Sequence, residues 1–232
     1  MTRDATLGII TIGQSPRDDV LPDFIRALGY TPIIEQRGLL DDLSAAQIAA
    51  LAPTRALDET LVTRLRDGTE VKLSEKRVIE MLPSAVEYLE RRGAGLIALF
   101  CTGDFPPVES RVPVLYPSAI LSAVVSALFA SRKSRERTLC VVAPTREQYD
   151  MLAQKWRGAG CALAFETLSP YTSSPAEVSQ CAARVARLQS DMIVLDCIGY
   201  TETLRATFAA ATGVPVILPR ALLARVTAEV FG

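Results

Sequence analysis

Short apolar runs alternate along the chain with longer segments that repeat apolar residues every three or four positions. The short runs predict buried strands, and the longer segments predict helices. The predicted strands are Leu7–Ile12, Thr31–Gln36, Leu96–Phe100, Val114–Tyr116, Leu139–Ala143, Ala162–Thr167, Met192–Leu195 and Pro215–Leu218. The predicted helices are about Asp19–Leu28, Ser44–Leu51, Ser74–Arg91, Ser118–Ser131, Glu147–Gly158, Pro175–Gln189, Glu202–Ala211 and Arg220–Val230. This alternation is typical of an α/β protein with parallel sheets.

One segment departs from the alternation. Between residues 62 and 74 the sequence VTRLRDGTEVKLS places two short runs around Asp67 and Gly68, a pair that is typical of tight turns. We therefore expect a β-hairpin in this segment.

The two halves of the chain repeat one sequence pattern, an apolar run followed by Cys-x-Gly. The apolar run GLIALF leads into Cys101-Thr102-Gly103, and the run DMIVLD leads into Cys197-Ile198-Gly199-Tyr200. The charged stretch at residues 131–137 separates the halves. We interpret the repeat as an internal duplication.

Composition narrows the class of protein. The 232 residues are enough for two α/β lobes of about 110 residues each. Hydrophobic residues make up 49% and charged residues 22%, and the formal net charge is −1, so nothing predicts binding to nucleic acid or to an anionic membrane. No apolar run approaches the roughly 18 to 20 residues of a spanning helix, and the N-terminal run reads as a strand and not as a signal peptide. We expect a cytoplasmic protein.

The sequence limits which side chains could carry out chemistry. The sequence has no histidine, which excludes histidine bases and histidine metal sites, and its five cysteines form no CxxC pair. We expect reduced thiols, no metal and no cofactor. Buried cysteine is common in apolar cores, and we interpret Cys140, Cys161 and Cys181 in that way.

Cys101 and Cys197 differ because each follows a predicted parallel strand. Ligands of open parallel sheets bind outside the carboxyl ends of the strands. A thiolate and a thiol on opposite sides of one carbon could remove a proton from one face and deliver one to the other. The pattern favours catalysis by these two thiols, although a purely structural role for each remains an alternative.

Several motifs together resemble the AroM family over nearly the whole chain. They are IITIGQSPRDD, RDGTEVKLSEKRV, LFCTGDF, YPSAI, QKW and LDCIGY. AroM-like proteins in turn resemble the aspartate/glutamate racemase superfamily, which includes hydantoin racemase, maleate isomerase and arylmalonate decarboxylase. The resemblance implies two Rossmann-like lobes related by pseudo-twofold symmetry, with an active site in the cleft. It assigns residues 1–115 and 212–232 to the first lobe and residues 116–211 to the second.

The resemblance also implies particular site residues. The superfamily's catalytic cysteines match Cys101 and Cys197, and its carboxylate-binding serine matches Ser15 in the loop after the first strand. The loop neighbours and the residues beside the two cysteines complete the expected binding set, which is Gln14, Arg17, Thr102, Gly103, Ile198, Gly199 and Tyr200. The residues after the cysteines depart from the superfamily pattern, which puts amino-acid substrates in doubt.

Two further junctions lie on the same predicted face. Pro117-Ser118 and Thr145 each stand between a strand and a helix, where they could line the cleft or serve as ordinary helix starts. Asp196 precedes Cys197, and its role is open.

The leading hypothesis is a cofactor-independent racemase or isomerase that acts on a small carboxylate-bearing molecule, with a decarboxylase as a close relative. The main alternative is a binding or sensor protein that keeps the cleft without chemistry, with a link to aromatic amino-acid metabolism suggested by the family name. A redox protein is a weaker alternative, because it needs the two sulfurs within disulfide distance. A homodimer is common in the superfamily.

Overall fold

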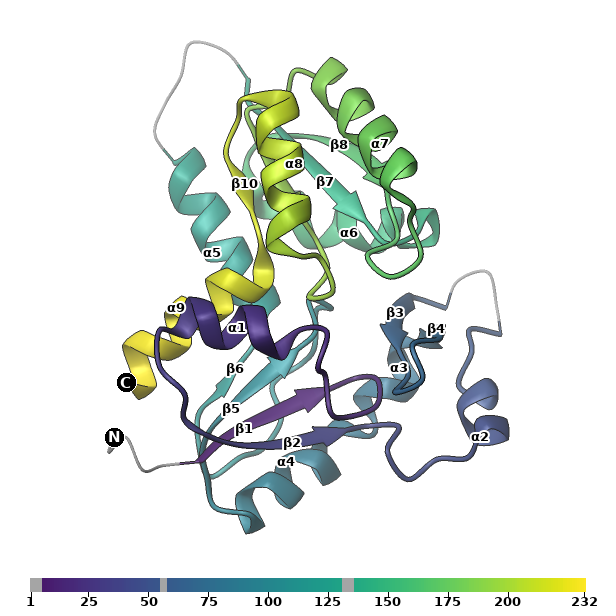
Figure 1. Cartoon of the computed structure of the whole chain (residues 1–232), viewed down its shortest axis with the longest axis vertical. Helices are drawn as coiled ribbons and strands as arrows, with labels where there is room; N and C mark the ends of the chain where they lie inside the picture. The colour runs from purple at the N-terminus through teal and green to yellow at the C-terminus, as the bar shows by residue number, and fades with distance from the viewer. Residues whose placement is uncertain (1–5, 55–57, 131–135) are drawn as a thin grey trace.

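Two parallel sheets organise the computed structural model, which describes residues 6–54, 58–130 and 136–232 (Figure 1). The first sheet has the order β2-β1-β5-β6, and the second has the order β10-β9-β7-β8. Their strands are β1 (Thr6–Thr11), β2 (Ile33–Gly38), β5 (Ala94–Phe100) and β6 (Val114–Leu115), then β7 (Thr138–Ala143), β8 (Ala162–Thr167), β9 (Met192–Leu195) and β10 (Val216–Ile217). In each sheet the first strand pairs with the next two, so both halves share one topology. The predicted α/β class with two parallel-sheet lobes is confirmed.

The helices agree with the sequence pattern in all but one place. They are α1 (Leu21–Leu28), α2 (Ala45–Ala50), α3 (Glu75–Ile79), α4 (Leu82–Arg91), α5 (Pro117–Phe129), α6 (Tyr149–Trp156), α7 (Pro175–Arg187), α8 (Glu202–Thr212) and α9 (Pro219–Phe231). Capping boxes at Ser44 and Ser174 fix the starts of α2 and α7. The single helix expected from Ser74 to Arg91 is wrong. Pro83 lies in the first turn of α4, because a proline is tolerated at a helix start and not in its interior.

The expected hairpin is present and reaches toward the second lobe. Strands β3 (Thr60–Arg64) and β4 (Glu70–Ser74) pair antiparallel, and Gly68 takes the positive φ of 96° that the turn requires. Lys72 of β4 forms an ion pair with Glu147, at 2.6 Å between Nζ and Oε2. Glu70 accepts a hydrogen bond from Ser169. The hairpin therefore covers the gap between the lobes.

The C-terminal segment is shared between the lobes. Strand β10 pairs with β9 of the second sheet, so the placement of residues 216–217 in the first lobe is wrong. Helix α9 then packs against α1 of the first lobe, beside which it lies in Figure 1. The rest of the proposed lobe boundary stays a prediction, and the charged stretch at 131–135 lies outside the described residues.

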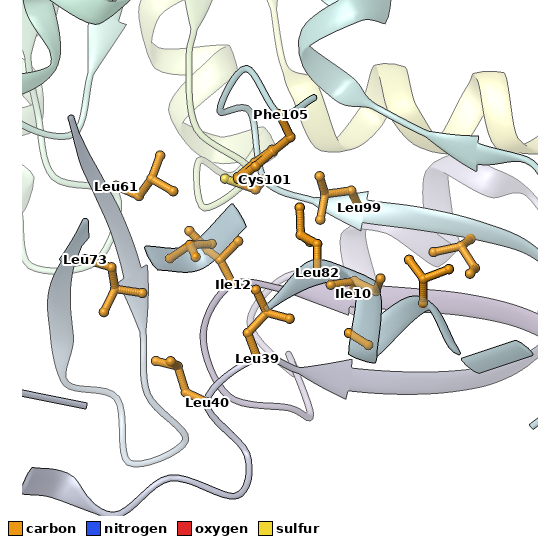
Figure 2. Close-up of a cluster of buried hydrophobic side chains, with 14 of the residues drawn as sticks. Ile10, Ile12, Leu39, Leu40, Leu61, Leu73, Leu82, Leu99, Cys101 and Phe105 are labelled. Carbon is orange, nitrogen blue, oxygen red and sulfur yellow. The ribbon is translucent and has the colours of Figure 1, made fainter. Parts of the chain in front are cut away.

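Apolar side chains cover both faces of each sheet and bury the strands that deliver the cysteines. Figure 2 shows one such cluster in the first lobe, where Cys101 lies at the edge near Phe105 and Leu61. Cys197 belongs to a corresponding cluster in the second lobe. Each cysteine thus stands where an apolar core meets the space between the lobes.

Candidate active site

Cys101 and Cys197 line the same cavity between the lobes. Cys101 follows β5 directly, and Cys197 follows β9 by two residues. Each side chain is 7% exposed, and neither forms a disulfide. The cavity has a volume of about 20 Å³, room for little more than one water molecule. A ligand larger than water therefore requires the cleft to open.

A glycine two residues after each cysteine donates its backbone N–H to the sulfur. The distance from Gly103 N to Cys101 Sγ is 3.4 Å, and the distance from Gly199 N to Cys197 Sγ is also 3.4 Å. A hydrogen bond from an N–H group favours the thiolate over the thiol. The repeated Cys-x-Gly motif thus encodes the same sulfur contact in both lobes.

The electrostatic surroundings of the two sulfurs differ. Burial raises the pKa of Cys101 to about 12, against the lowering effect of the Gly103 N–H group, and the neighbouring Cys197 raises it further. Burial also raises the pKa of Cys197, but there the Gly199 N–H group, the charge of Arg17 and a hydrogen bond from Tyr171 all oppose it. Each sulfur thus has one backbone donor and one positive side chain nearby, Lys155 for Cys101 and Arg17 for Cys197, and Cys197 has in addition the Tyr171 hydroxyl and the opposing charge of Asp196.

Arg17 and Tyr171 form the contact that distinguishes Cys197. Arg17 is 2% exposed and binds Asp19 through two nitrogens, at 2.7 and 2.8 Å. Its Nη2 also donates to the Tyr171 hydroxyl at 3.2 Å, from one lobe to the other. Burial disfavours the charged guanidinium, yet the hydrogen bond and charge of Asp19 outweigh burial and raise the pKa of Arg17. The arginine stays positive beside the cleft.

A buried ion pair holds the loop that carries Cys197. Lys155 Nζ lies 2.8 and 2.9 Å from the two carboxylate oxygens of Asp196, and Trp156 Nε1 donates to the same carboxylate at 2.8 Å. Lys155 also donates to the Thr102 carbonyl at 2.8 Å, and the Thr102 hydroxyl donates to the Asp196 carbonyl at 3.1 Å. The pair thereby ties the segment after one cysteine to the segment before the other.

Part of the predicted site set lines the cavity and part lies elsewhere. The two cysteines are joined there by Arg17, Thr102, Gly103 and Ile198. Ser15 does not line it, because its hydroxyl donates to Asp41 at 2.6 Å and its N–H donates to the same carboxylate at 2.7 Å. Gln14 accepts from the backbone N–H of Arg66 at 3.0 Å.

The remaining predicted residues have structural contacts. The Tyr200 hydroxyl donates to the Leu168 carbonyl at 2.6 Å, within the core of the second lobe. Gly199 packs under the Tyr171 ring, which lies 2.6 Å from where a Cβ would stand. Pro117 and Ser118 are buried in the first turn of α5, and the Thr145 hydroxyl donates to Glu147 at 3.2 Å. The structure places these side chains outside the cavity.

Sequence reasoning missed four residues at the site. Lys155 lies in the family motif QKW, which assigns it no role, and Tyr171, Gln148 and Thr63 carry no local signal. Tyr171 comes from the loop between β8 and α7, whereas Thr63 comes from the hairpin. Only the meeting of the two lobes brings these side chains to the cysteines.

The described residues show neither a metal-binding cluster nor a membrane-spanning helix. Across residues 6–54, 58–130 and 136–232, no group of three or more Cys, Asp or Glu side chains is arranged to hold a metal ion. In the same part of the chain, no helix has the length and apolar character needed to cross a membrane.

The fold is similar to those of several solved enzymes. Unliganded arylmalonate decarboxylase superposes with a TM-score of 0.58 at 16% identity, over 98% of this chain and 94% of that chain. Glutamate racemase from Aquifex pyrophilus superposes with a TM-score of 0.58 at 13% identity, over 98% of this chain and 84% of that chain. Allantoin racemase from Pseudomonas fluorescens superposes with a TM-score of 0.59 at 14% identity, over 97% of this chain and 89% of that chain. The chain therefore has the two-lobed α/β fold of these racemases and of the decarboxylase.

Within that class the sequence identifies the family. The family model described as AroM protein matches residues 7–231, so the chain belongs to the AroM family. The predicted resemblance is confirmed. None of the curated proteins matches the sequence.

Proposed function

We propose that the protein is a cofactor-independent racemase or isomerase that moves a proton at a carbon next to a carboxylate. The observation that carries the proposal is the presence of both strand-end thiols in one cavity. The fold of racemases and of a decarboxylase supports the class of reaction. We further propose that the protein works in the cytoplasm.

The two thiols have different starting roles in this proposal. Burial raises the pKa of Cys197, and Arg17 and Tyr171 oppose that rise, so we assign Cys197 as the base. Cys101 is the acid, because burial keeps it protonated at neutral pH. The Cys197 thiolate takes the proton and leaves the C–H electron pair on the carbon, where the carboxylate delocalises it. The Cys101 thiol then protonates the opposite face and becomes the thiolate, and exchange with solvent resets the pair.

Hydrogen exchange with solvent tests this chemistry. In deuterated water the wild-type protein is expected to exchange the α-hydrogen of a substrate enantiomer and to invert it, as followed by NMR and chiral chromatography. Cys101→Ala or Cys197→Ala should each reduce inversion by at least a hundredfold, because general acid–base catalysis contributes roughly 10² to 10⁴. Cys161→Ala is the matched control, since Cys161 lies outside the cavity. Unchanged exchange in both cavity variants would refute the proposal.

A binding or sensor function is the second candidate. The raised pKa of Cys101, about 12, favours it, because a thiol that stays protonated suits recognition without proton transfer. Saturable binding of a ligand without any exchange of its α-hydrogen would favour this candidate over the enzyme.

A further inference from the structure

Two polar atoms at the cysteine cavity are buried without a partner. Gln148 is 6% exposed and Thr63 is 1% exposed, and both line the cavity. Gln148 Oε1 and Thr63 Oγ1 have no hydrogen-bond partner among the described residues. An unpaired buried polar group destabilises a fold, so two of them at one cavity suggest that a ligand completes their bonding.

The orientation of the Gln148 amide is fixed by its other end. Gln148 Nε2 donates to the Thr60 carbonyl at 2.9 Å, and a carbonyl accepts only from the nitrogen. The unpaired atom is therefore the amide oxygen, which can only accept. A ligand that satisfies it must supply a donor, an O–H or an N–H group.

Thr63 provides the complementary group from the opposite lobe. It belongs to β3 of the hairpin, and its hydroxyl lies against Gly13 of the loop after β1, 2.5 Å from where a Cβ would stand. A hydroxyl can donate to a carboxylate oxygen. Gln148 and Thr63 thus offer an acceptor and a donor to one ligand.

The charges around the cavity argue against an ammonium group as the donor. Asp196 is the only acid among the cavity residues, and its carboxylate already binds Lys155 and Trp156. A cationic ligand group buried there would lack a counter-charge, which is costly in a site of low dielectric. A neutral donor fits the site.

We propose that Gln148 and Thr63 form a recognition subsite for a small acid that carries a neutral hydrogen-bond donor, a hydroxyl or an amide N–H, beside its reacting carbon. The inference rests on the proposed function in that the cavity holds the substrate. Thr63 binds the carboxylate, and Gln148 accepts from the neighbouring donor.

Three ligands with one skeleton test the subsite. Mandelate, 2-phenylpropionate and phenylglycine share a phenyl group and a carboxylate and differ in a hydroxyl, a methyl and an ammonium group. Titration calorimetry on the full chain is expected to show mandelate binding at least tenfold tighter than the other two. Equal affinities, a preference for phenylglycine, or no binding by any of the three would overturn the inference.

Variants assign the preference to its residues. Gln148→Leu should abolish the preference for mandelate, and Gln148→Glu should shift it toward phenylglycine by supplying a counter-charge. Thr63→Val should weaken the binding of mandelate and the binding of 2-phenylpropionate by the same factor. Gln154→Leu, on the exposed face of α6, is the control that should bind as the wild type does. If Gln148→Leu does not fold, as judged by circular dichroism, Gln148→Glu still decides the point, and a preference that survives in it overturns the inference.

The outcomes separate this inference from the proposed function. A preference for mandelate without exchange of its α-hydrogen leaves the subsite standing and removes the thiol chemistry. If the α-hydrogen of phenylglycine exchanges as fast as that of mandelate, the thiol chemistry is supported and the proposed subsite is refuted.

Discussion

At the scale of the residue, the two sulfurs share a backbone contact and differ in their side-chain neighbours. The N–H groups of Gly103 and Gly199 lie at the same distance from their cysteines. Only Cys197 has an arginine and a tyrosine hydroxyl beside it. This asymmetry gives the two thiols different electrostatic surroundings.

Tyr171→Phe tests the asymmetry. Loss of the hydroxyl removes one hydrogen bond that favours the Cys197 thiolate, so the pKa of Cys197 should rise. The rate of alkylation of Cys197 by iodoacetamide should then fall several-fold at pH 8, and its pH profile should move to higher pH. Mass spectrometry of the labelled peptide provides the measurement.

Tyr149→Phe is the control for that experiment. The Tyr149 hydroxyl contacts Thr167 at 2.7 Å and does not line the cavity. A Cys197 profile that moves as far in this variant as in Tyr171→Phe would contradict the assignment.

At the scale of the element, the end of α6 holds the loop after β9. Lys155 and Trp156 are neighbours on α6, and both reach the Asp196 carboxylate. The side chains of the ion pair are 3% and 0% exposed. The position of Cys197 therefore depends on a helix that lies far from it in the sequence.

Lys155→Met should destabilise the protein by about 3–5 kcal/mol, because it leaves a buried carboxylate without its cation. Urea unfolding followed by circular dichroism measures the loss. The double variant Lys155→Met, Asp196→Leu should recover part of it, since no buried charge is then unpaired. Arg91→Met breaks the exposed pair with Glu87 and should cost at most about 1 kcal/mol. A loss in Lys155→Met no larger than this would contradict the role of the pair.

At the scale of the whole molecule, one buried arginine joins the lobes behind the cysteines. Arg220 of α9 is 1% exposed and donates to the carbonyls of Ile198 and Gly199, at 2.9 and 2.7 Å. It also donates to Asp19 and Asp23 of the first lobe. Through Arg220, the loop after Cys197 is thus held to residues of the first lobe.

The pH dependence of global stability is expected to include a contribution from Glu75. Burial, followed by the neighbouring Glu59, raises the pKa of Glu75 to about 8, from an ordinary value of 4.5. Between these pH values the folded chain keeps a proton that the unfolded chain has released, so the free energy of unfolding falls as pH rises. The slope from this group is at most about 1.4 kcal/mol per pH unit.

Glu75→Gln should remove that slope, because the amide resembles the protonated acid at every pH. Urea unfolding between pH 5 and pH 8 measures it, with Glu80→Gln on the exposed surface as the control. A slope that is the same in both variants would show that Glu75 titrates normally.

The amino-acid sequence by itself determined the elements and the family. Periods of two and of three to four residues, the serine caps of α2 and α7, and the Asp-Gly turn are local signals, because each depends on neighbours within one turn or strand. The duplicated Cys-x-Gly motif was local too, and it located both sulfurs at strand ends. Pro83 was an overlooked local signal that divides α3 from α4.

Only the tertiary structure decided which side chains meet the sulfurs. Ser15 follows β1 as expected, yet its hydroxyl faces Asp41 because the loop after β2 returns to it. Tyr171 reaches the cavity from a loop, Gln148 from the 3-10 turn before α6 and Thr63 from the hairpin, and the sequence pattern does not show that these segments meet. The physical reason is that contacts between distant segments depend on how two lobes pack together, and no period or cap along the chain records that packing.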